Sequence, residues 1–291
     1  MTGNRVQLLF KNNTELGDHP RSDAARWPRG PEGNLMHDGL GLLVSTAIYI
    51  TNDSIVVTDT NEIKRLSDLS KIDTLFYCQT NYREQMDIDP TGQVEWGLHP
   101  VPGYMNNLSE IPAMSNDQNS WPLQGWPYIG REKHWPGEWD GRFGRGQIKS
   151  DLEAYFIAND AQDLEYLGDD DRVKYYPRIG VQIGDIDPSV TVQKGRPWGG
   201  IGVRVKQRGF QWNNPMAQDC IFWEYTIANI SDYDIPHMAF GYWLDNNIGG
   251  ENTGDDGSYD EILDLAYCWD TDGIGNTGYR TGTAGYAYLE S

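Results

Sequence analysis

Apolar and polar residues alternate with a period of two along several stretches of the chain, most clearly in its second half. Between Ile221 and Ile227 every second side chain is apolar, and the same spacing recurs from Met238 to Leu244. Because successive side chains of a strand point to opposite faces, this spacing predicts strands with one buried face. We expect Trp223 to share the inward face with Ile221 and Ile227. The short Asp-rich connection between the two stretches predicts that they pair as a hairpin.

Other runs are apolar, or rich in β-branched and aromatic residues, and are typical of strands. They cover residues 5–10, 40–50, 55–57, 74–80, 152–158, 201–210, 261–269 and 284–289. A turn signal at Asn52-Asp53 predicts a hairpin between 40–50 and 55–57. Helical spacing is clearest over residues 59–72, where a capping-box sequence precedes the apolar repeat, and it predicts one short helix.

Residues 97–149 have a different composition, dominated by Gly, Pro, Trp and Asn, and keep no periodicity. We expect them to form an ordered, irregular excursion packed on the core. Many strands, one short helix and long Trp/Gly/Pro-rich loops predict a mainly β protein, specifically a β-sandwich of jelly-roll or Ig-like type. The 291 residues would form one large β domain, or two joined β units over 1–96 and 150–291. The chain ends directly after strand-like residues, which is compatible with the front part of a longer protein.

The net charge of the chain limits which kinds of molecule it is expected to bind. Lys and Arg number 23 against 43 Asp and Glu, which gives a formal net charge of −20. Because each phosphate contact needs a cation, this balance argues against nucleic acid as a partner. No apolar run is long enough to predict a membrane span. Three distant cysteines without CxxC spacing, Cys78, Cys220 and Cys268, are interpreted as buried free thiols, with one disulfide as the alternative.

An acidic, Gly-rich loop follows the strand predicted at 238–244, and a D-x-D-G segment follows at 270–273. Asp and Asn oxygens on flexible loops are the ligands that calcium prefers, so we expect a calcium site here. The candidate ligands are Asp245, Asn247, Asp255, Asp256, Asp260, Asp270 and Asp272. The alternative is an acidic loop that is simply solvated. A second acidic run, over 159–163 and 169–171, is a weaker metal candidate because consecutive Asp residues are typical of solvated turns.

The excursion at 97–149 concentrates tryptophan beside carboxylates. Exposed indole rings stack on sugar rings, whereas buried ones anchor a long loop to a sheet. The candidate glycan-binding residues are Trp121, Trp126, Trp135, Trp139, Glu138 and Asp140. A glycoside hydrolase would also need two carboxylates about 5–10 Å apart, for which Glu224 is a further candidate. Nucleotide-binding, hydrolase-elbow and zinc motifs are missing from the sequence, so it nominates no catalytic residue.

The stretch from Ile221 to Ser231 and the one from Phe240 to Gly250 resemble segments of large, uncharacterised secreted bacterial proteins. In those proteins a WEYTIxNxS strand leads to FGxWxDxDxG, an acidic loop and DLAYxWDxDG, which residues 264–273 resemble here. Residues 135–141 and 155–160 extend the resemblance. Such proteins often carry an export signal and a C-terminal sorting domain, neither of which is visible in this sequence. The resemblance implies an extracellular or cell-surface setting and supplies no activity.

Together these observations favour a secreted or surface-exposed structural or binding protein over an enzyme. We expect it to be stabilised by calcium, and to associate with other copies of itself or with extracellular matrix or glycan. The alternative is a carbohydrate-binding module or a glycoside hydrolase that uses the tryptophan-rich segment. Trp residues buried under loops would favour the first role, and a Trp-lined groove with facing carboxylates would favour the second.

Overall fold

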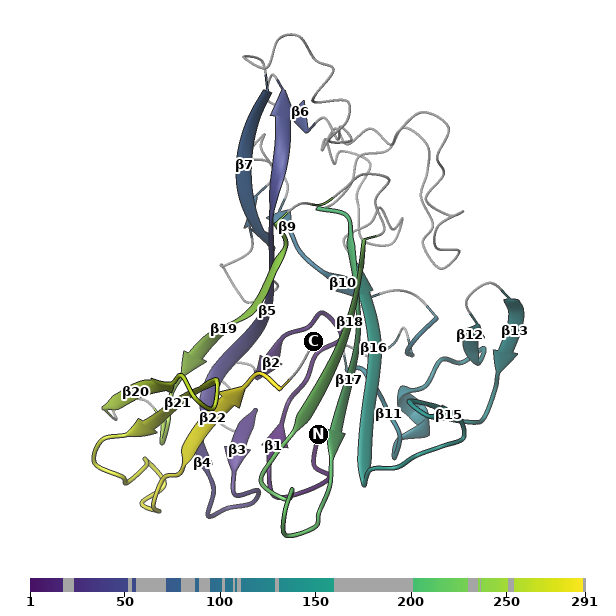
Figure 1. Ribbon diagram of the computed structural model, residues 1–291. Coiled ribbons are helices and arrows are strands. Elements are labelled where there is room, and N and C mark those ends of the chain that lie inside the picture. Colours follow the sequence, from purple (N-terminus) through teal and green to yellow (C-terminus); the bar gives the residue numbers. More distant parts are fainter. Residues whose placement is uncertain are drawn as a thin grey trace.

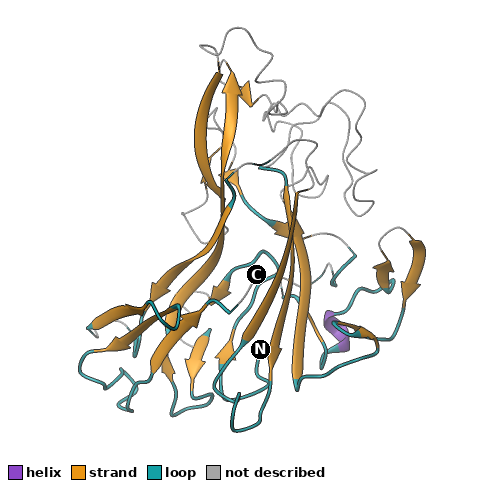
Figure 2. Cartoon of the chain, in the orientation of Figure 1, coloured by secondary structure: helices purple, strands orange, loops and turns teal. Residues whose placement is uncertain are grey.

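The computed structural model of the chain is mainly β, with several antiparallel sheets (Figures 1 and 2). The structure describes residues 1–17, 24–51, 54–55, 72–79, 87–88, 95–100, 103–106, 108, 111–128, 131–159, 201–229, 235, 237–250 and 254–289. Within these ranges no helix is long and apolar enough to cross a membrane. The helical element among them is a single 3-10 turn, η3 (Gln118–Ser120).

Two larger sheets are the main elements of the fold. In the first, β16 (Leu152–Asn159), β17 (Val203–Gln211) and β18 (Phe222–Asn229) run side by side. The short strands β10 (His99–Pro100) and β11 (Ala113–Met114) both pair with β16. All these pairs are antiparallel. Since β18 is the last strand in this order, it has a described partner along one edge only.

The second sheet is organised around one long strand, β5 (His37–Thr51). Along it lie β2 (Leu16–Gly17), β6 (Ser54–Ile55), β7 (Ile72–Gln79) and β19 (Ala239–Asn246). The predicted hairpin is confirmed, since β6 pairs back onto the end of β5. Strand β19 is terminal in this sheet, as β18 is in the first.

Smaller sheets complete the described part of the chain. They are β1 (Gln7–Leu8), β3 (Ala25–Trp27) and β4 (Asn34–Leu35); β20 (Asp255–Asp260), β21 (Leu265–Asp270) and β22 (Thr283–Ala287); β8 (Asp87–Ile88) and β9 (Glu95–Trp96); β12 (Trp126–Tyr128) and β13 (Arg131–Trp135); β14 (Asp140–Gly141) and β15 (Gly144–Arg145). In Figure 1 the β20–β22 sheet and the β12–β15 excursion lie on opposite flanks of the two larger sheets.

One apolar core draws on both larger sheets. It includes Leu40, Leu42 and Val44 from β5, together with Phe156 from β16 and Val205 from β17. Burying such side chains fully is worth about 1.5–3 kcal/mol each. The predicted inward face of residues 221–227 is confirmed, because residues 222–227 belong to β18 and the alternate apolar side chains from Ile221 to Ile227 pack against this core. The same core joins residues from both of the units that the sequence suggested.

The predicted hairpin between 221–227 and 238–244 is wrong. Both strands form, but β18 pairs with β17 and β19 pairs with β5, so consecutive strands belong to different sheets. The alternating pattern specifies which face of a strand is buried and carries no information about which neighbour pairs with its edge. Here the inward faces of β18 and β19 meet across the core, where the rings of Tyr225 and Tyr242 lie 5.9 Å apart.

Two other expectations differ in part from the structure, and a third falls almost entirely outside the described residues. The first predicted strand, 5–10, is reduced to the two residues of β1. The helix predicted at 59–72 lies outside the described residues except for Ile72, which begins β7. Cys220 and Cys268 are free, but Cys220 is exposed instead of buried because it lies in the turn before β18. The side chain of Cys78 lies outside the described ones.

Candidate functional site

The tryptophan segment forms a compact aromatic cluster against the outer face of β16. Trp126 and Trp139 are each only 1 % exposed, and their rings lie 5.3 Å apart, edge to face. Trp121 contacts both, and Trp126 also lies 5.8 Å from the ring of Tyr155 on β16. Trp135 packs against the cluster at its edge. The rings are therefore used mainly to anchor the excursion to the sheet.

Two indole N–H groups in this cluster bond to backbone carbonyls. Trp126 Nε1 donates to the Glu138 carbonyl at 2.6 Å, and Trp121 Nε1 donates to the Met114 carbonyl at 2.7 Å. Such a partner stabilises a buried indole N–H, since leaving it unpaired costs about 1–3 kcal/mol. The N–H of Trp139 has no partner among the described residues. The first bond ties β12 to the turn before β14, and the second ties Trp121 to β11.

The three candidate carboxylates, Glu138, Asp140 and Glu224, each lie beside an arginine. The Glu138 carboxylate pairs with Arg145, whose Nη2 donates to it at 3.1 Å. Glu224, on β18, pairs with Arg142 at 2.6 Å on the surface. Burial raises the pKa of Asp140, and Arg208 opposes that rise. Glu138 and Glu224 are each paired with a separate arginine, and Asp140 shares Arg208 with Glu153. A glycosidase instead needs two carboxylates that face each other across a groove.

A buried ion pair, which was not among the residues that the sequence suggested, lies beneath this segment. Arg208 on β17 is 3 % exposed, Glu153 on β16 is 1 % exposed, and their side chains form a charge-paired hydrogen bond. The Arg208 guanidinium also lies 3.8 Å over the ring of Tyr155 and donates to the Asp140 carbonyl at 2.8 Å. The sequence does carry a signal, since residues 204, 206 and 208 are all cations at every second position of one predicted strand. Three cations on the same face of a strand indicate a specialised surface.

The acidic residues proposed as calcium ligands fall into two groups, because successive side chains of β20 point to opposite faces of the sheet. Asp255 lies opposite Asp270 in the β20–β21 ladder. Burial is the largest cause that raises the pKa of Asp255, and the charges of Asp270 and Asp38 add to it. We call Asp38, Asp255 and Asp270 the Asp270 cluster. Asn247 belongs beside it, since its amide donates to Asp38 Oδ1 at 3.1 Å. Asp245 lies opposite Gly39 on the adjoining strand.

The remaining predicted ligands are not brought to this cluster. Asp256 and Asp260 occupy alternate positions to Asp255, on the other face of the strand. Asp260 accepts from the amides of Ile262 and Leu263 in the following turn, and Asp272 accepts from Ile274 N at 2.8 Å. These are turn contacts typical of Asp. Asn159 ends β16, and the rest of the second acidic run lies outside the described residues.

Several buried polar atoms around the Asp270 cluster have no hydrogen-bond partner among the described residues. They are Asp270 Oδ2, Asn246 Oδ1 and His37 Nδ1. Burial lowers the pKa of His37 to about 4, although Asp38 and Asp245 act in the opposite direction, so the imidazole is neutral. Such unpaired atoms are rare in folded proteins and need an explanation. Within the described ranges, however, no three His, Cys, Asp or Glu side chains form a ready-made metal group.

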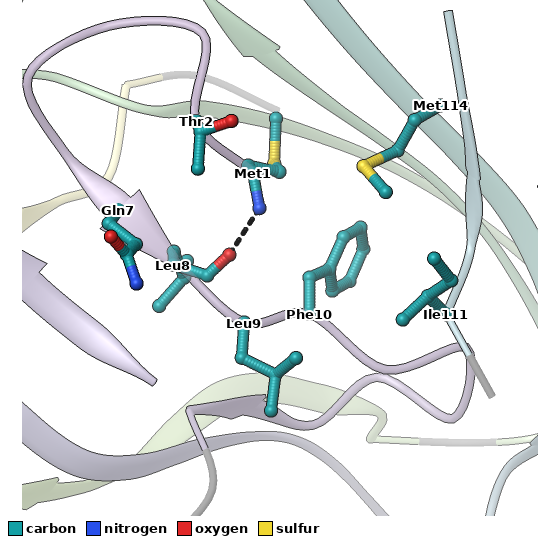
Figure 3. Close-up of a pocket in the computed structure, with 8 residues that line it drawn as sticks. All are labelled: Met1, Thr2, Gln7, Leu8, Leu9, Phe10, Ile111 and Met114. Carbon is teal, nitrogen blue, oxygen red and sulfur yellow. Dashed lines mark hydrogen bonds between the residues drawn. The ribbon is translucent and has the colours of Figure 1, made fainter. Parts of the chain in front are cut away.

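A small cavity of about 160 Å³ lies elsewhere, beneath β1 (Figure 3). It is lined mostly by apolar side chains, among them Leu9, Phe10, Ile111 and Met114. The dashed line in Figure 3 marks the hydrogen bond from the Met1 amine to the Leu8 carbonyl. With Thr2 and Gln7 as its polar side chains, the cavity offers no acid–base pair for chemistry.

Comparisons with protein-family models, with curated proteins and with solved structures found no match to the chain. A function for this chain therefore has to be inferred from the geometry of its described residues.

Proposed function

We propose that this chain is a secreted or surface-exposed structural or binding protein of β-sandwich type, stabilised by calcium and able to associate with further copies of itself. The observation that carries the proposal is the burial of Trp126 and Trp139 beneath the excursion, where they anchor loops. The packing of the two larger sheets around one core supports the sandwich. The resemblance of residues 221–250 to secreted bacterial proteins supports the extracellular setting.

Self-association is supported by the terminal strands of the two larger sheets. Among the described strands, β18 and β19 each pair along one edge, and the other edge is able to pair with another chain. On β19 the side chains of Phe240 and Trp243 are 48 % and 41 % exposed. Contacts through such aromatic rings would have to offset the repulsion between chains of charge −20, which salt screens over about 8–10 Å at physiological strength.

Light scattering over a series of salt and calcium concentrations tests this role. We expect the mass of the wild-type particles to rise with salt or calcium. Replacing both exposed rings of β19, by Phe240→Ser and Trp243→Ser, should reduce that rise. Ile262→Ser is the matched control, because Ile262 is also apolar and exposed but lies in the turn after β20. A wild-type chain that stays monomeric at every condition would refute self-association.

One observation favours glycan binding as a second candidate. Tyr267 and Trp269 are stacked, with ring centroids 5.6 Å apart, on the face of β21 opposite to the buried Cys268. Cross-strand neighbours on this face are Asp256, Ser258 and Thr283, whose oxygens are able to bond sugar hydroxyls. Tyr267→Ala should then abolish retention on a neutral polysaccharide in affinity electrophoresis. If wild type and Tyr267→Ala migrate equally, and the polysaccharide slows neither of them, glycan binding on this face is refuted.

A further inference from the structure

Asp255 and Asp270 bring together two negative charges that no cation among the described residues neutralises. Asp255 and Asp270 lie directly opposite each other in the ladder, where like charges are destabilising. In the described part of the chain neither of them forms an ion pair, and Asp270 is only 4 % exposed. A buried carboxylate without a compensating charge is strongly unfavourable. Something positive is therefore expected beside it.

The two oxygens of Asp270 have different environments. Oδ1 accepts a long bond from Asp272 N, at 3.3 Å, whereas Oδ2 is fully buried and has no donor among the described residues. Asp255 is held in place by Ile248 N, which donates to its Oδ2 at 3.0 Å. Buried acceptors that lack donors are suited to a cation, since a cation needs only oxygen lone pairs.

The backbone at Gly249 comes close to the Asp270 carboxylate. A Cβ at Gly249, where φ is +89°, would lie 3.3 Å from Asp270 Oδ2 and 2.9 Å from the Gly275 backbone, so this position favours glycine. Across the sheet, the register shifts between Asp245 and Asn246, which leaves Asp38 as the extra residue of a bulge on β5. A bulge changes the direction in which a side chain points, and here the Asp38 carboxylate accepts a hydrogen bond from the Asn247 amide.

We propose that a hard divalent cation, calcium in an extracellular setting, binds at the Asp270 cluster between Asp255 and Asp270. Backbone carbonyls of the 246–250 loop would add neutral oxygens, and Asp38 would add charge at the rim. This mixture of ligands explains why no group of three acidic, His or Cys side chains is preformed in the described residues. Asp256, Asp260 and Asp272 are excluded from the site. The site rests on the proposed function, because it is where the calcium of the proposed stabilisation would bind.

Thermal unfolding of the full chain with and without calcium tests the site. Wild type should gain about 4 °C or more in Tm when calcium is added at roughly 100 times its Kd, because only the folded state binds. Asp270→Asn should lose this gain, and without calcium it should melt no lower than wild type, since the unpaired buried charge is removed. Asp256→Asn, on the other face of the adjoining strand, is the matched control and should keep the full gain.

Terbium provides a second measurement that does not depend on stability. Its luminescence, excited through the aromatic residues of the protein, should rise on binding and fall when calcium displaces it. Asp255→Asn, at a more exposed position, should weaken terbium binding about tenfold or more and serves as the variant if Asp270→Asn does not fold. No calcium-dependent gain in wild type, an equal gain in Asp270→Asn, or a gain with zinc and none with calcium would overturn the site. Calcium binding by a chain that stays monomeric would leave the site intact and refute only self-association.

Discussion

The indole ring of Trp223 lies over Gly209, its cross-strand partner in the β17–β18 ladder. A Cβ built at Gly209 would come within 3.0 Å of three ring carbons of Trp223. The same ring packs edge to face on Phe10, with centroids 4.7 Å apart. The missing side chain on β17 thus provides the space in which the Trp223 ring reaches the core.

Gly209→Ala should therefore destabilise the protein, by about 1–3 kcal/mol, because the added methyl displaces a packed ring. The control is Gly241→Ala on β19, where a Cβ would meet nothing within 4 Å. That change should be neutral or stabilising by about 0.5 kcal/mol, since alanine has less chain entropy to lose on folding. Urea unfolding of both variants measures the two effects. Equal stability of the two variants would contradict the close packing of Trp223 on Gly209.

Because Arg208 and Glu153 form a buried ion pair, replacing one of them should lower the unfolding free energy far more than replacing both would suggest. Glu153→Gln or Arg208→Met alone should cost about 3–5 kcal/mol of unfolding free energy, because each leaves a buried charge without its partner. The double variant, Arg208→Met with Glu153→Gln, should be more stable than the sum of the two changes predicts. Chemical denaturation of the wild type, the two single variants and the double variant completes a double-mutant cycle.

The surface pair of Arg142 and Glu224 is the natural comparison for the buried one. Its side chains are 46 % and 39 % exposed, so solvent screens the attraction. Glu224→Gln should cost less than about 1 kcal/mol. A similar loss at Glu153 and Glu224 would show that the Arg208 pair is not protected from water.

The strands, and the face that each one buries, are largely predictable from the sequence. Residues 152–158 and 201–210 carry enough apolar side chains to identify β16 and β17 without any partner in view. The meeting of Tyr225 and Tyr242 from different sheets is not predictable in this way, because edge pairing depends on contacts that are distant in the chain. The short Asp-rich connection therefore suggests a hairpin that does not form.

In the candidate sites, too, some features are predictable from the sequence and others are not. Alternation along residues 255–260 is enough by itself to separate Asp255 from Asp256 and Asp260. The burial of Asp270 does not follow from any local pattern, because it depends on the approach of the Gly249 loop from another sheet. The cations at 204, 206 and 208 mark the strand in the sequence, but the burial of Arg208 and Glu153 is not predictable from it. Charged residues in strands usually face solvent, and here the packed excursion covers them.

The two thiols described should differ in reactivity. Cys220 is exposed in a turn, whereas Cys268 is buried on β21 with its Sγ 3.8 Å from the Ala284 carbonyl. A small thiol reagent should therefore modify Cys220 in the native protein, and Cys268 only when the β20–β22 sheet opens. Mass spectrometry of the digested protein assigns the modified residue at each time. Modification of Cys268 as fast as Cys220 would contradict its burial.

Alkaline pH should destabilise the fold through its buried tyrosines. Burial is the largest cause that raises the pKa of four phenols above the ordinary value of about 10. They are Tyr155, Tyr225, Tyr242 and Tyr286. A raised folded-state pKa means that the folded chain holds these protons more tightly than the unfolded chain. The stabilisation is thus complete below about pH 10 and is lost as pH rises toward the folded-state values, at about 1.4 kcal/mol per pH unit for each phenol.

Urea unfolding at a series of pH values, combined with phenolate absorbance, measures this loss. The buried phenols should ionise together with unfolding, and Tyr155→Phe should reduce the slope of stability against pH by about one proton. Tyr279→Phe, at an exposed ring, is the matched control and should leave the slope unchanged. Lysines also lose their charge in this range, but they do so equally in both variants, so the difference in slope isolates Tyr155. If both variants gave the wild-type slope, the phenol of Tyr155 would not be held neutral by the fold.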